Sequence, residues 1–442
     1  MRWKASMIVA TAIIGLWVAA VGCSKNGGEP AKSAEPAKTT EPAKAVEPAP
    51  EPVTLKLMRL GTSISKDEVE QMISKPVKQK YPYITVEFME PKSLAELLAA
   101  GRPADVPELI FTDYSNLSSV IDLKYPADLN DTLKKQKADL SKLEQSAVEG
   151  VQALDAKGQL FGLPIYLDKY MLFYNKDIFD KFAMPYPTGD MTYEDLIALV
   201  KKLTRTDNGV QYLGYRWADL YTVGYQLGLP VINGKTGKAD LQTDGWKYAL
   251  SFIKQLVDSG VDNKVTHDHF FKERRLGTYP QWMGAAYGMI AAAGKDFNWD
   301  MTAMPYYKET PKVSGPTKPI YLMAYAGSKN KEQAILAMNY IATSPEVQTI
   351  MSQQGRISVV KDDAIRKQFG TKVDLLAGKQ TSAVFRYPFG KLPNTTAYES
   401  QAWAGLDTAP VSVINGVDVN TALRTAEEAA NKKVDEYLSS RK

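Results

Sequence analysis

The chain has 442 residues, of which 44% are apolar and 10% aromatic, as expected for a globular protein that can form two domains and not for a disordered chain. Lys and Arg number 54 against 50 acidic residues, a formal net charge of +4, so nothing in the charge balance calls for a nucleic acid partner. The only cysteine is Cys23, which excludes an internal disulfide framework and a cysteine metal cluster.

The first 22 residues have the pattern of an export signal. Arg2 and Lys4 precede a run of uncharged, mostly apolar residues from position 7 to position 21, which is too short to span a bilayer and suits a signal peptide. The next residues, AVGC ending at Cys23, resemble a lipobox, although Ala20 stands where a large aliphatic residue is usual. We therefore predict cleavage after residue 22 and lipidation of Cys23, which would anchor the protein to the outer face of the cytoplasmic membrane at the cell surface.

Residues 23–52, which begin with the lipidated cysteine, read as a disordered stalk. Glu-Pro-Ala recurs at positions 29, 35, 41 and 47 with lysines in between. Such a segment cannot bury enough apolar surface to fold, and proline biases it toward an extended polyproline II conformation. We expect a tether that holds a folded domain away from the membrane.

The hydrophobic pattern after the stalk alternates between strands and helices. It predicts strands over 53–60, 84–88 and 107–111, with helices over 67–80 and 94–100 between them. This order is typical of a parallel α/β sheet. Asp113 and Tyr114 come directly after the third strand, and ligands bind at the carboxyl ends of strands in such sheets.

Residues 162–179, GLPIYLDKYMLFYNKDIF, combine a turn, a buried strand and the start of a helix. Tyr166, Asp168, Lys169 and Tyr170 lie beside the apolar run 171–174. We interpret the stretch as a crossing between two lobes that presents polar aromatic side chains to the space between them. Further along, the spacing of Trp217, Tyr221 and Tyr225 predicts one face of a helix over 216–229.

Three stretches carry a resemblance to a known family. GLP followed by YNKDIF, the segment TYEDL…KKLT over 192–204, and SKNKEQAILAMNYIATSPEVQ over 328–348 resemble the extracellular solute-binding proteins, family 1, which are maltose-binding-protein-like receptors of ABC importers. The resemblance covers nearly all of residues 53–442. One departure is that residues 290–294 read IAAAG after Met289, where many relatives have a sugar-stacking Gly-x-Trp element.

The resemblance implies a two-lobed α/β fold of the periplasmic-binding-protein type II, with a hinge between the lobes. We expect an N-terminal lobe of residues 53–166 plus about 285–322, and a C-terminal lobe of residues 167–284 plus about 323–442. Crossings between the lobes are expected near residues 164–170, 284–289 and 320–325. Ligand contacts from both lobes would exist only in the closed form, so ligand would shift the balance toward closure.

The family implies a substrate-binding lipoprotein that captures a small solute, most plausibly a sugar or oligosaccharide, and delivers it to ABC transporter permease subunits. We expect no catalytic activity, cofactor or metal, and a monomer. Aromatic faces cover the apolar side of a sugar ring while carboxylates accept hydrogen bonds from its hydroxyls. On this basis the expected ligand-binding residues are Asp113, Tyr114, Tyr166, Asp168, Tyr170, Trp217, Tyr221 and Trp282.

Other interpretations of these residues remain. Each candidate aromatic side chain could instead be part of a core, and Asp168 with Lys169 could be a surface pair. The cleft could bind a peptide or another polar solute, or the protein could be a surface glycan-binding protein with no role in transport. Motifs that imitate serine penicillin-recognising enzymes, such as Lys235-Thr236-Gly237, lie in a predicted turn, which does not suit that mechanism.

Overall fold

The computed structural model describes residues 50–440, apart from 103–104, 156, 217–218, 262, 309–311, 314, 391, 393–395 and 397. The predicted signal segment, Cys23 and nearly all of the predicted stalk therefore lie outside the described residues. Among the residues that are described, we find no helix with the length and apolar character needed to cross a membrane.

The N-terminal part of the sheet confirms the predicted alternation of strands and helices. β1 (Val53–Leu60) pairs in parallel with β2 (Ile84–Met89) on one side and with β3 (Leu109–Asp113) on the other. The predicted helix over 67–80 is a continuous helical segment of α1 (Lys66–Val69), a π-helical turn (Glu70–Ser74) and α2 (Lys75–Lys80). It begins at Ser65, whose side chain forms a capping box with Glu68.

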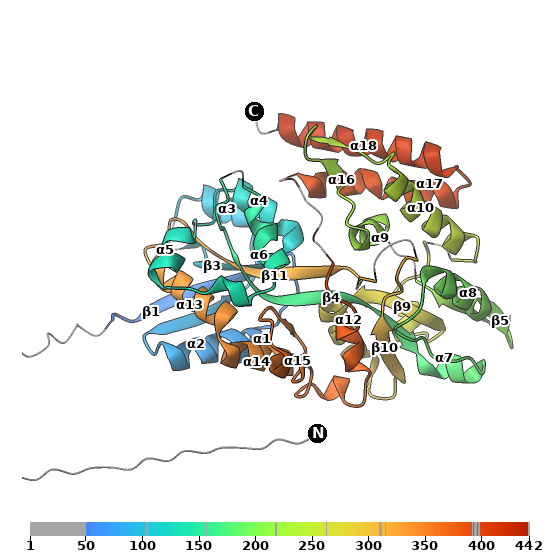
Figure 1. Ribbon diagram of the computed structural model, residues 1–442, viewed down its shortest axis with the longest axis horizontal. Helices are drawn as coiled ribbons and strands as arrows, with labels where there is room; N and C mark the ends of the chain where they lie inside the picture. Colours follow the sequence, from blue (N-terminus) through green and yellow to red (C-terminus); the bar gives the residue numbers. More distant parts are fainter. Residues whose placement is uncertain are drawn as a thin grey trace, which may run out of the picture. The chain divides into compact units, whose positions relative to one another are not determined.

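One long strand joins the two halves of the molecule. All 13 residues of β4 (Leu163–Asn175) are buried. Its first part pairs with β11 (Thr317–Ala324), and its second part pairs with β9 (Leu276–Trp282). β11 also pairs with β3, and β9 with β6 (Val210–Tyr215), so the strand order is β2-β1-β3-β11-β4-β9-β6-β5. In Figure 1, β4 and β11 run between a left and a right group of helices.

Helices cover both ends of this sheet (Figure 1). Those around the N-terminal strands are α3 (Leu94–Ala99), α4 (Leu117–Asp122), α5 (Asn130–Lys135), α6 (Gln145–Gln152), α13 (Lys331–Thr343), α14 (Pro345–Gln353) and α15 (Asp363–Arg366). The remaining helices are α7 (Lys176–Lys181), α8 (Tyr193–Leu203), α9 (Leu220–Gln226), α10 (Asp244–Val257), α11 (Asp268–Phe271), α12 (Met283–Ala293), α16 (Glu399–Leu406), α17 (Thr408–Ile414) and α18 (Val419–Ser439).

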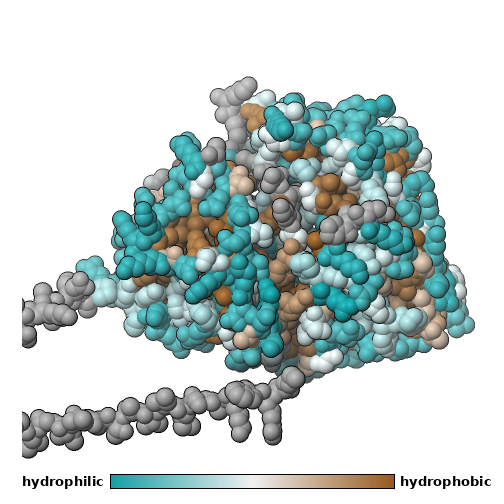
Figure 2. All heavy atoms as spheres, in the orientation of Figure 1, coloured by the Kyte–Doolittle hydropathy of each residue, from teal (hydrophilic) through white to brown (hydrophobic). Residues whose placement is uncertain are grey.

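Short strands complete the structure: β5 (Arg205–Asp207), β7 (Ile232–Asn233), β8 (Lys238–Ala239), β10 (Trp299–Ala303) and β12 (Ile357–Ser358). β10 and β12 pair with β4, and β7 pairs with β8 in a separate two-stranded sheet. Figure 2 shows that apolar side chains on one face of the molecule gather in separate patches between hydrophilic ones.

The buried apolar residues form two large clusters. One contains side chains of β1, β3 and β11 together with residues 334–384. The other contains side chains of α8, α9, α10 and the C-terminal helices α16 to α18. Residues 334–384 thus pack with the N-terminal strands, whereas the boundaries predicted from the sequence put them in the C-terminal lobe. The region 284–289, predicted as a crossing, lies within α12. The lobe boundaries themselves stay a prediction.

Candidate functional site

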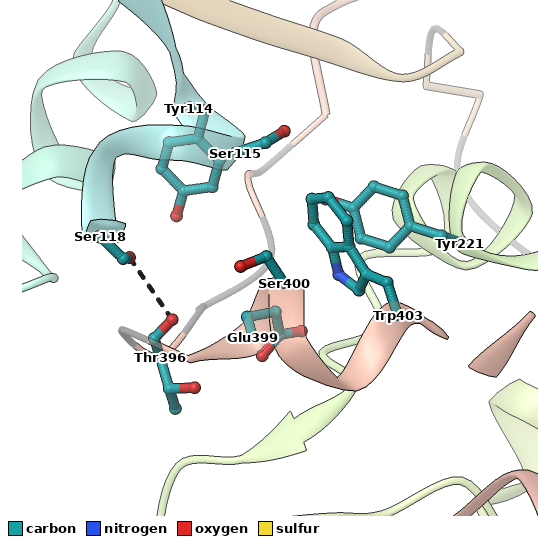
Figure 3. A pocket seen from close by; sticks show the side chains of 8 residues that line it. All are labelled: Tyr114, Ser115, Ser118, Tyr221, Thr396, Glu399, Ser400 and Trp403. Carbon is teal, nitrogen blue, oxygen red and sulfur yellow. Dashed lines mark hydrogen bonds between the residues drawn. The ribbon is translucent and has the colours of Figure 1, made fainter. Parts of the chain in front are cut away.

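A pocket lies where the segment after β3 meets α9 and α16 (Figure 3). Its free volume is about 10 Å³, room for about one water molecule, and it is lined by Tyr114, Ser115, Ser118, Tyr221, Thr396, Glu399, Ser400 and Trp403. By the predicted boundaries the first three residues belong to the N-terminal lobe, and the others come from α9, α16 and the segment that leads into α16. We call this space the cleft pocket, because its walls come from both lobes.

Two aromatic rings form one wall of the cleft pocket. The ring centroids of Tyr221 and Trp403 are 4.2 Å apart, with 40° between the ring planes. Figure 3 shows Tyr114 across the pocket from this pair. Tyr114 and Tyr221 were expected at the ligand from the sequence, but Trp403 was not, and the Gly-x-Trp element of many relatives is missing after Met289. In this chain the α9–α16 pair supplies an aromatic surface instead.

Three polar atoms at the cleft pocket are buried without a hydrogen-bond partner among the described residues. They are the Tyr221 hydroxyl, the Thr396 hydroxyl and the Trp403 indole N–H. Buried polar groups in proteins are nearly always hydrogen-bonded, and exceptions call for an explanation. A ligand rich in hydroxyl groups could both donate to and accept from these three groups. The chemistry of the lining therefore suits a polar solute that stacks on an aromatic ring, and the walls of the pocket must move apart to admit one.

Glu399 lies beneath this pocket and is only 4% exposed. Its carboxylate accepts hydrogen bonds from the backbone N–H groups of Val231 (2.6 Å) and Ile232 (3.2 Å). Burial raises the pKa of Glu399 to about 7, although these hydrogen bonds oppose the shift. The carboxylate thereby fixes the chain at the start of β7 against the start of α16. Trp403 lies one helical turn after Glu399 on the same helix.

Asp113 at the end of β3 is held by two side chains. Its Oδ2 atom lies 2.8 Å from the Lys318 ammonium, and its Oδ1 atom accepts a hydrogen bond of 2.7 Å from Asn116. Asn116 fits close to the end of β1 because residue 61 is a glycine with φ of +66°, and a Cβ there would lie 2.2 Å from the Asn116 amide nitrogen. The chain therefore fixes the carboxylate before any ligand arrives.

Asp168 lies on the crossing part of β4 and is 8% exposed. Its Oδ1 atom accepts backbone hydrogen bonds from Lys169 (2.9 Å) and from Gly284 (3.2 Å) at the start of α12. Burial raises the pKa of Asp168, and the charges of Lys318 and Arg356 oppose that shift. Asp168 is thus a buried carboxyl group and not a member of a surface pair, which corrects the alternative interpretation of this position.

Arg356 places a second cation next to the crossing strand. It makes an ion pair with Glu68, and its guanidinium lies 5.3 Å from the centroid of the Tyr166 ring. Burial by itself would raise the pKa of Glu68, but Arg356 and the hydrogen bonds from Ser65 lower it. A groove of about 760 Å³, lined in part by Arg59, Glu68 and Arg356, opens beside this pair. We refer to Glu68, Asp113, Asp168, Lys318 and Arg356 as the charged cluster.

The structure brings most of the predicted site residues together. Asp113 and Asp168 belong to the charged cluster, and Tyr114 and Tyr221 line the cleft pocket. Tyr166 and Tyr170 are 1% and 3% exposed, so both rings are packed in the interior. Tyr170 meets the Trp282 ring edge to face with centroids 5.3 Å apart, and the Lys318 ammonium lies 4.6 Å from the centroid of that indole. A ligand contact for any of these residues stays a prediction.

Two predictions around α9 have a different outcome. Trp217 lies outside the described residues. The predicted helix over 216–229 was too long, because α9 begins only after Asp219, whose side chain accepts a hydrogen bond of 2.7 Å from the Thr222 backbone N–H and so caps the helix. Tyr221 and Tyr225 do lie close together on α9, with ring centroids 5.7 Å apart.

The sequence analysis missed Trp403, Lys318 and Arg356. Glu399 and Trp403 are four residues apart, so they lie on the same face of α16, but nothing in the sequence indicates that α9 lies opposite. Among the described residues, no group of three or more His, Cys, Asp or Glu side chains could hold a metal ion.

Solved structures with a similar fold include two-lobed binding proteins. An ABC substrate-binding protein from Listeria monocytogenes, solved in complex with cycloalternan, has a TM-score of 0.71 and 20% identity, covering 87% of this chain and 100% of that one. A cyclic alpha-maltosyl-1,6-maltose binding protein from Arthrobacter globiformis has a TM-score of 0.66 and 17% identity, covering 87% of this chain and 100% of that one.

A curated relative is a binding protein of Brucella abortus (strain 2308). It is 23% identical over 242 residues, which cover 50% of this chain and 56% of that protein. The chain therefore spans about half the length of the curated relatives it matches. The family model described as bacterial extracellular solute-binding protein matches residues 73–372.

Two α/β lobes joined by crossing strands, with an aromatic and polar pocket between them, define a two-lobed solute-binding protein. The chain belongs to the bacterial extracellular solute-binding protein family. Members of this family are binding proteins and act outside the cytoplasm, at the cell surface or in the periplasm.

Proposed function

We propose that this protein is an extracellular receptor that binds a sugar or oligosaccharide between its lobes and delivers it to the permease of an ABC importer. The cleft pocket carries this proposal. Tyr221 and Trp403 offer an aromatic surface, and three buried polar groups beside it have no hydrogen-bond partner among the described residues. A sugar ring has an apolar C–H face for stacking and hydroxyl groups for hydrogen bonding.

The similar structures support the same solute class. They include a complex with cycloalternan, a binding protein for cyclic alpha-maltosyl-1,6-maltose, and the GacH receptor of Streptomyces glaucescens in complex with acarbose. In this chain the expected ligand residues are Tyr114, Tyr221 and Trp403 in the cleft pocket. Asp113 and Asp168 would orient the ligand from the charged cluster, because charge-assisted hydrogen bonds to carboxylates are strong.

A thermal-shift screen against mono- and oligosaccharides, with amino acids and peptides alongside, tests the proposal. A ligand that binds only the folded state stabilises it by mass action and so raises the melting temperature. At a ligand concentration of one hundred times Kd, the free energy of unfolding increases by about 2.7 kcal/mol. We expect a rise with one saccharide class. A rise with peptides alone would overturn the sugar assignment, and affinity for insoluble glycan without any small-molecule response would indicate a surface glycan-binding protein.

We also propose that the receptor is a monomer tethered to the outer face of the cytoplasmic membrane through lipidated Cys23 and the stalk of residues 23–52. The AVGC sequence and the repeated Glu-Pro-Ala segments support this proposal. Replacement of Cys23 by Ser should release the protein from the membrane fraction without changing its affinity for ligand. Retention of Cys23→Ser in that fraction would contradict the lipid anchor.

A further inference from the structure

The ammonium group of Lys318 occupies a cage between Trp282 and Asp113, and Asp113 directly precedes Tyr114 of the cleft pocket. Its Nζ atom lies 2.8 Å from Asp113 Oδ2 and 4.6 Å from the centroid of the Trp282 indole. Lys318 is paired with Asp168 in the register of β11 and β4, and its charge opposes the rise that burial causes in the pKa of Asp168. The side chains of Lys318 and Asp113 are only 15% and 4% exposed.

Carboxylates and an indole ring are the groups with which proteins bind ammonium ions. A cation over the face of Trp is attracted by the negative charge density of the ring, and more strongly where water is excluded. A carboxylate adds a charge-assisted hydrogen bond. The cage therefore has the chemistry of an amine-binding site, and the chain itself supplies the amine from β11.

We propose that Lys318 determines the charge of the solutes that the cleft accepts. Its ammonium fills the cage and neutralises Asp113, so that the cleft binds uncharged solutes and rejects amines. This inference rests on the proposed function, because it specifies which polar solutes the receptor takes. Specificity of this kind arises as much from repulsion of the wrong ligand as from attraction of the right one.

The two classes of charged solute are rejected for different reasons. An amine that enters the cleft is repelled by the Lys318 ammonium, which already occupies the position where Asp113 and Trp282 would stabilise the charge of the amine. An acidic solute would bring a further carboxylate to a lysine that already pairs with Asp113 and lies opposite Asp168, so like-charge repulsion would oppose its binding. An uncharged solute leaves the ion pair of Lys318 and Asp113 intact, so it can bind to the aromatic wall and the polar groups of the cleft pocket.

The most direct test removes the Lys318 ammonium by substitution and asks whether a small amine in solution binds in its place. Lys318→Ala removes the ammonium and the side chain beyond Cβ, and ethylammonium chloride supplies an ammonium group with two of the three missing carbon atoms. We expect ethylammonium to raise the melting temperature of Lys318→Ala by about 2 °C or more, at concentrations above its Kd. Ethanol and sodium chloride at the same concentration should have no such effect, and the wild-type protein should not respond.

Lys254→Ala is the matched control. Lys254 makes an ion pair with Asp258 at the same distance of 2.8 Å, but both side chains are about half exposed, so its removal should leave no site for ethylammonium. A response of the wild-type protein or of Lys254→Ala equal to that of Lys318→Ala would overturn the proposal, because it would show a general salt effect. An unresponsive but folded Lys318→Ala would overturn it as well.

If Lys318→Ala does not fold, Lys318→Gln supplies the test, because Gln keeps a hydrogen-bond donor for Asp113 without the charge. We expect its affinity for glucosamine relative to glucose to exceed the wild-type ratio about tenfold or more. An unchanged ratio would contradict the role of Lys318. The two proposals can fail independently. If the protein is not a sugar receptor, the wild-type protein will bind no saccharide. The ethylammonium response of Lys318→Ala does not depend on any sugar and tests the cage alone.

Discussion

Tyr437, near the end of the last helix, donates a hydrogen bond of 2.6 Å from its hydroxyl to Asp122 Oδ2 at the end of α4. The helix α18 packs in the C-terminal cluster, whereas α4 follows β3 in the N-terminal lobe. α4 also carries Ser118, which lines the cleft pocket. The bond therefore joins the two lobes at the element that forms one wall of the candidate site.

Replacement of Tyr437 by Phe should weaken ligand binding by favouring the open form. Loss of one hydrogen bond to a carboxylate would lower the affinity for the saccharide about 3- to 10-fold, mainly through faster dissociation. Stopped-flow fluorescence measures the dissociation rate. Tyr398→Phe is the control, because its hydroxyl donates a hydrogen bond to Gly237 O, and both residues belong to the predicted C-terminal lobe. Equal dissociation rates for wild type and Tyr437→Phe would show that the bond does not affect closure.

Replacement of Gly284 by Ala should disturb the charged cluster. A Cβ at position 284 would lie 2.9 Å from Arg356 Nη1 and 3.1 Å from Asp168 Oδ2, so Arg356 or Asp168 must move. We expect the saccharide affinity to fall about tenfold or more, as titration calorimetry can measure.

Gly288→Ala provides the matched control on the same helix. A Cβ at position 288 would meet nothing within 4 Å, and Ala is favoured over Gly in a helix interior by about 0.5–1 kcal/mol. This variant should gain stability and keep its affinity. If Gly284→Ala bound as tightly as Gly288→Ala, the geometry of the charged cluster would not matter for binding.

Lys169 should make folding depend on pH. Its side chain is fully buried, its ammonium donates a hydrogen bond to Val384 O, and burial lowers its pKa from 10.5 to about 7. As the pH falls from 10.5 to 7, the unfolded chain binds a proton at this lysine before the folded chain does, so the contribution of Lys169 to stability is lost over this range.

Lys169→Met removes this dependence while filling most of the volume. The free energy of unfolding of the variant relative to wild type should therefore increase by roughly 3–5 kcal/mol as the pH falls from 10.5 to 7, and level off below. Urea unfolding at several pH values measures the difference. Lys254→Met, at an exposed position, should show no comparable trend. A constant difference between Lys169→Met and wild type would mean that Lys169 keeps its ordinary pKa.

Local patterns were sufficient to predict the N-terminal strands, the amphipathic helix after β1 and the crossing strand. In each of these, the hydrophobic period depends on residues close together in the chain. The same holds for Asp113 and Asp168, which were identified from their position at a strand end and on the crossing. Their partners Lys318 and Arg356 are more than 180 residues further along, and only the folded sheet brings them near.

The aromatic wall of the cleft pocket could not be predicted for a similar reason. Tyr221 was expected to face the ligand as part of a longer helix, but Trp403, which stacks against it, comes from a helix near the C-terminus. The packing of residues 334–384 with the N-terminal strands was equally unpredictable, because an amphipathic helix shows which of its faces is buried and not which sheet covers it.

The most direct test of the sugar receptor is titration calorimetry of the saccharide that gives the largest thermal shift, with wild type and Trp403→Ala. We predict one ligand bound per wild-type chain, and an affinity at least roughly 30-fold weaker in the variant, since central aromatic contacts contribute about 2 kcal/mol or more. The melting temperature without ligand shows whether the variant is folded. Equal affinities in two folded proteins would contradict binding in the cleft pocket.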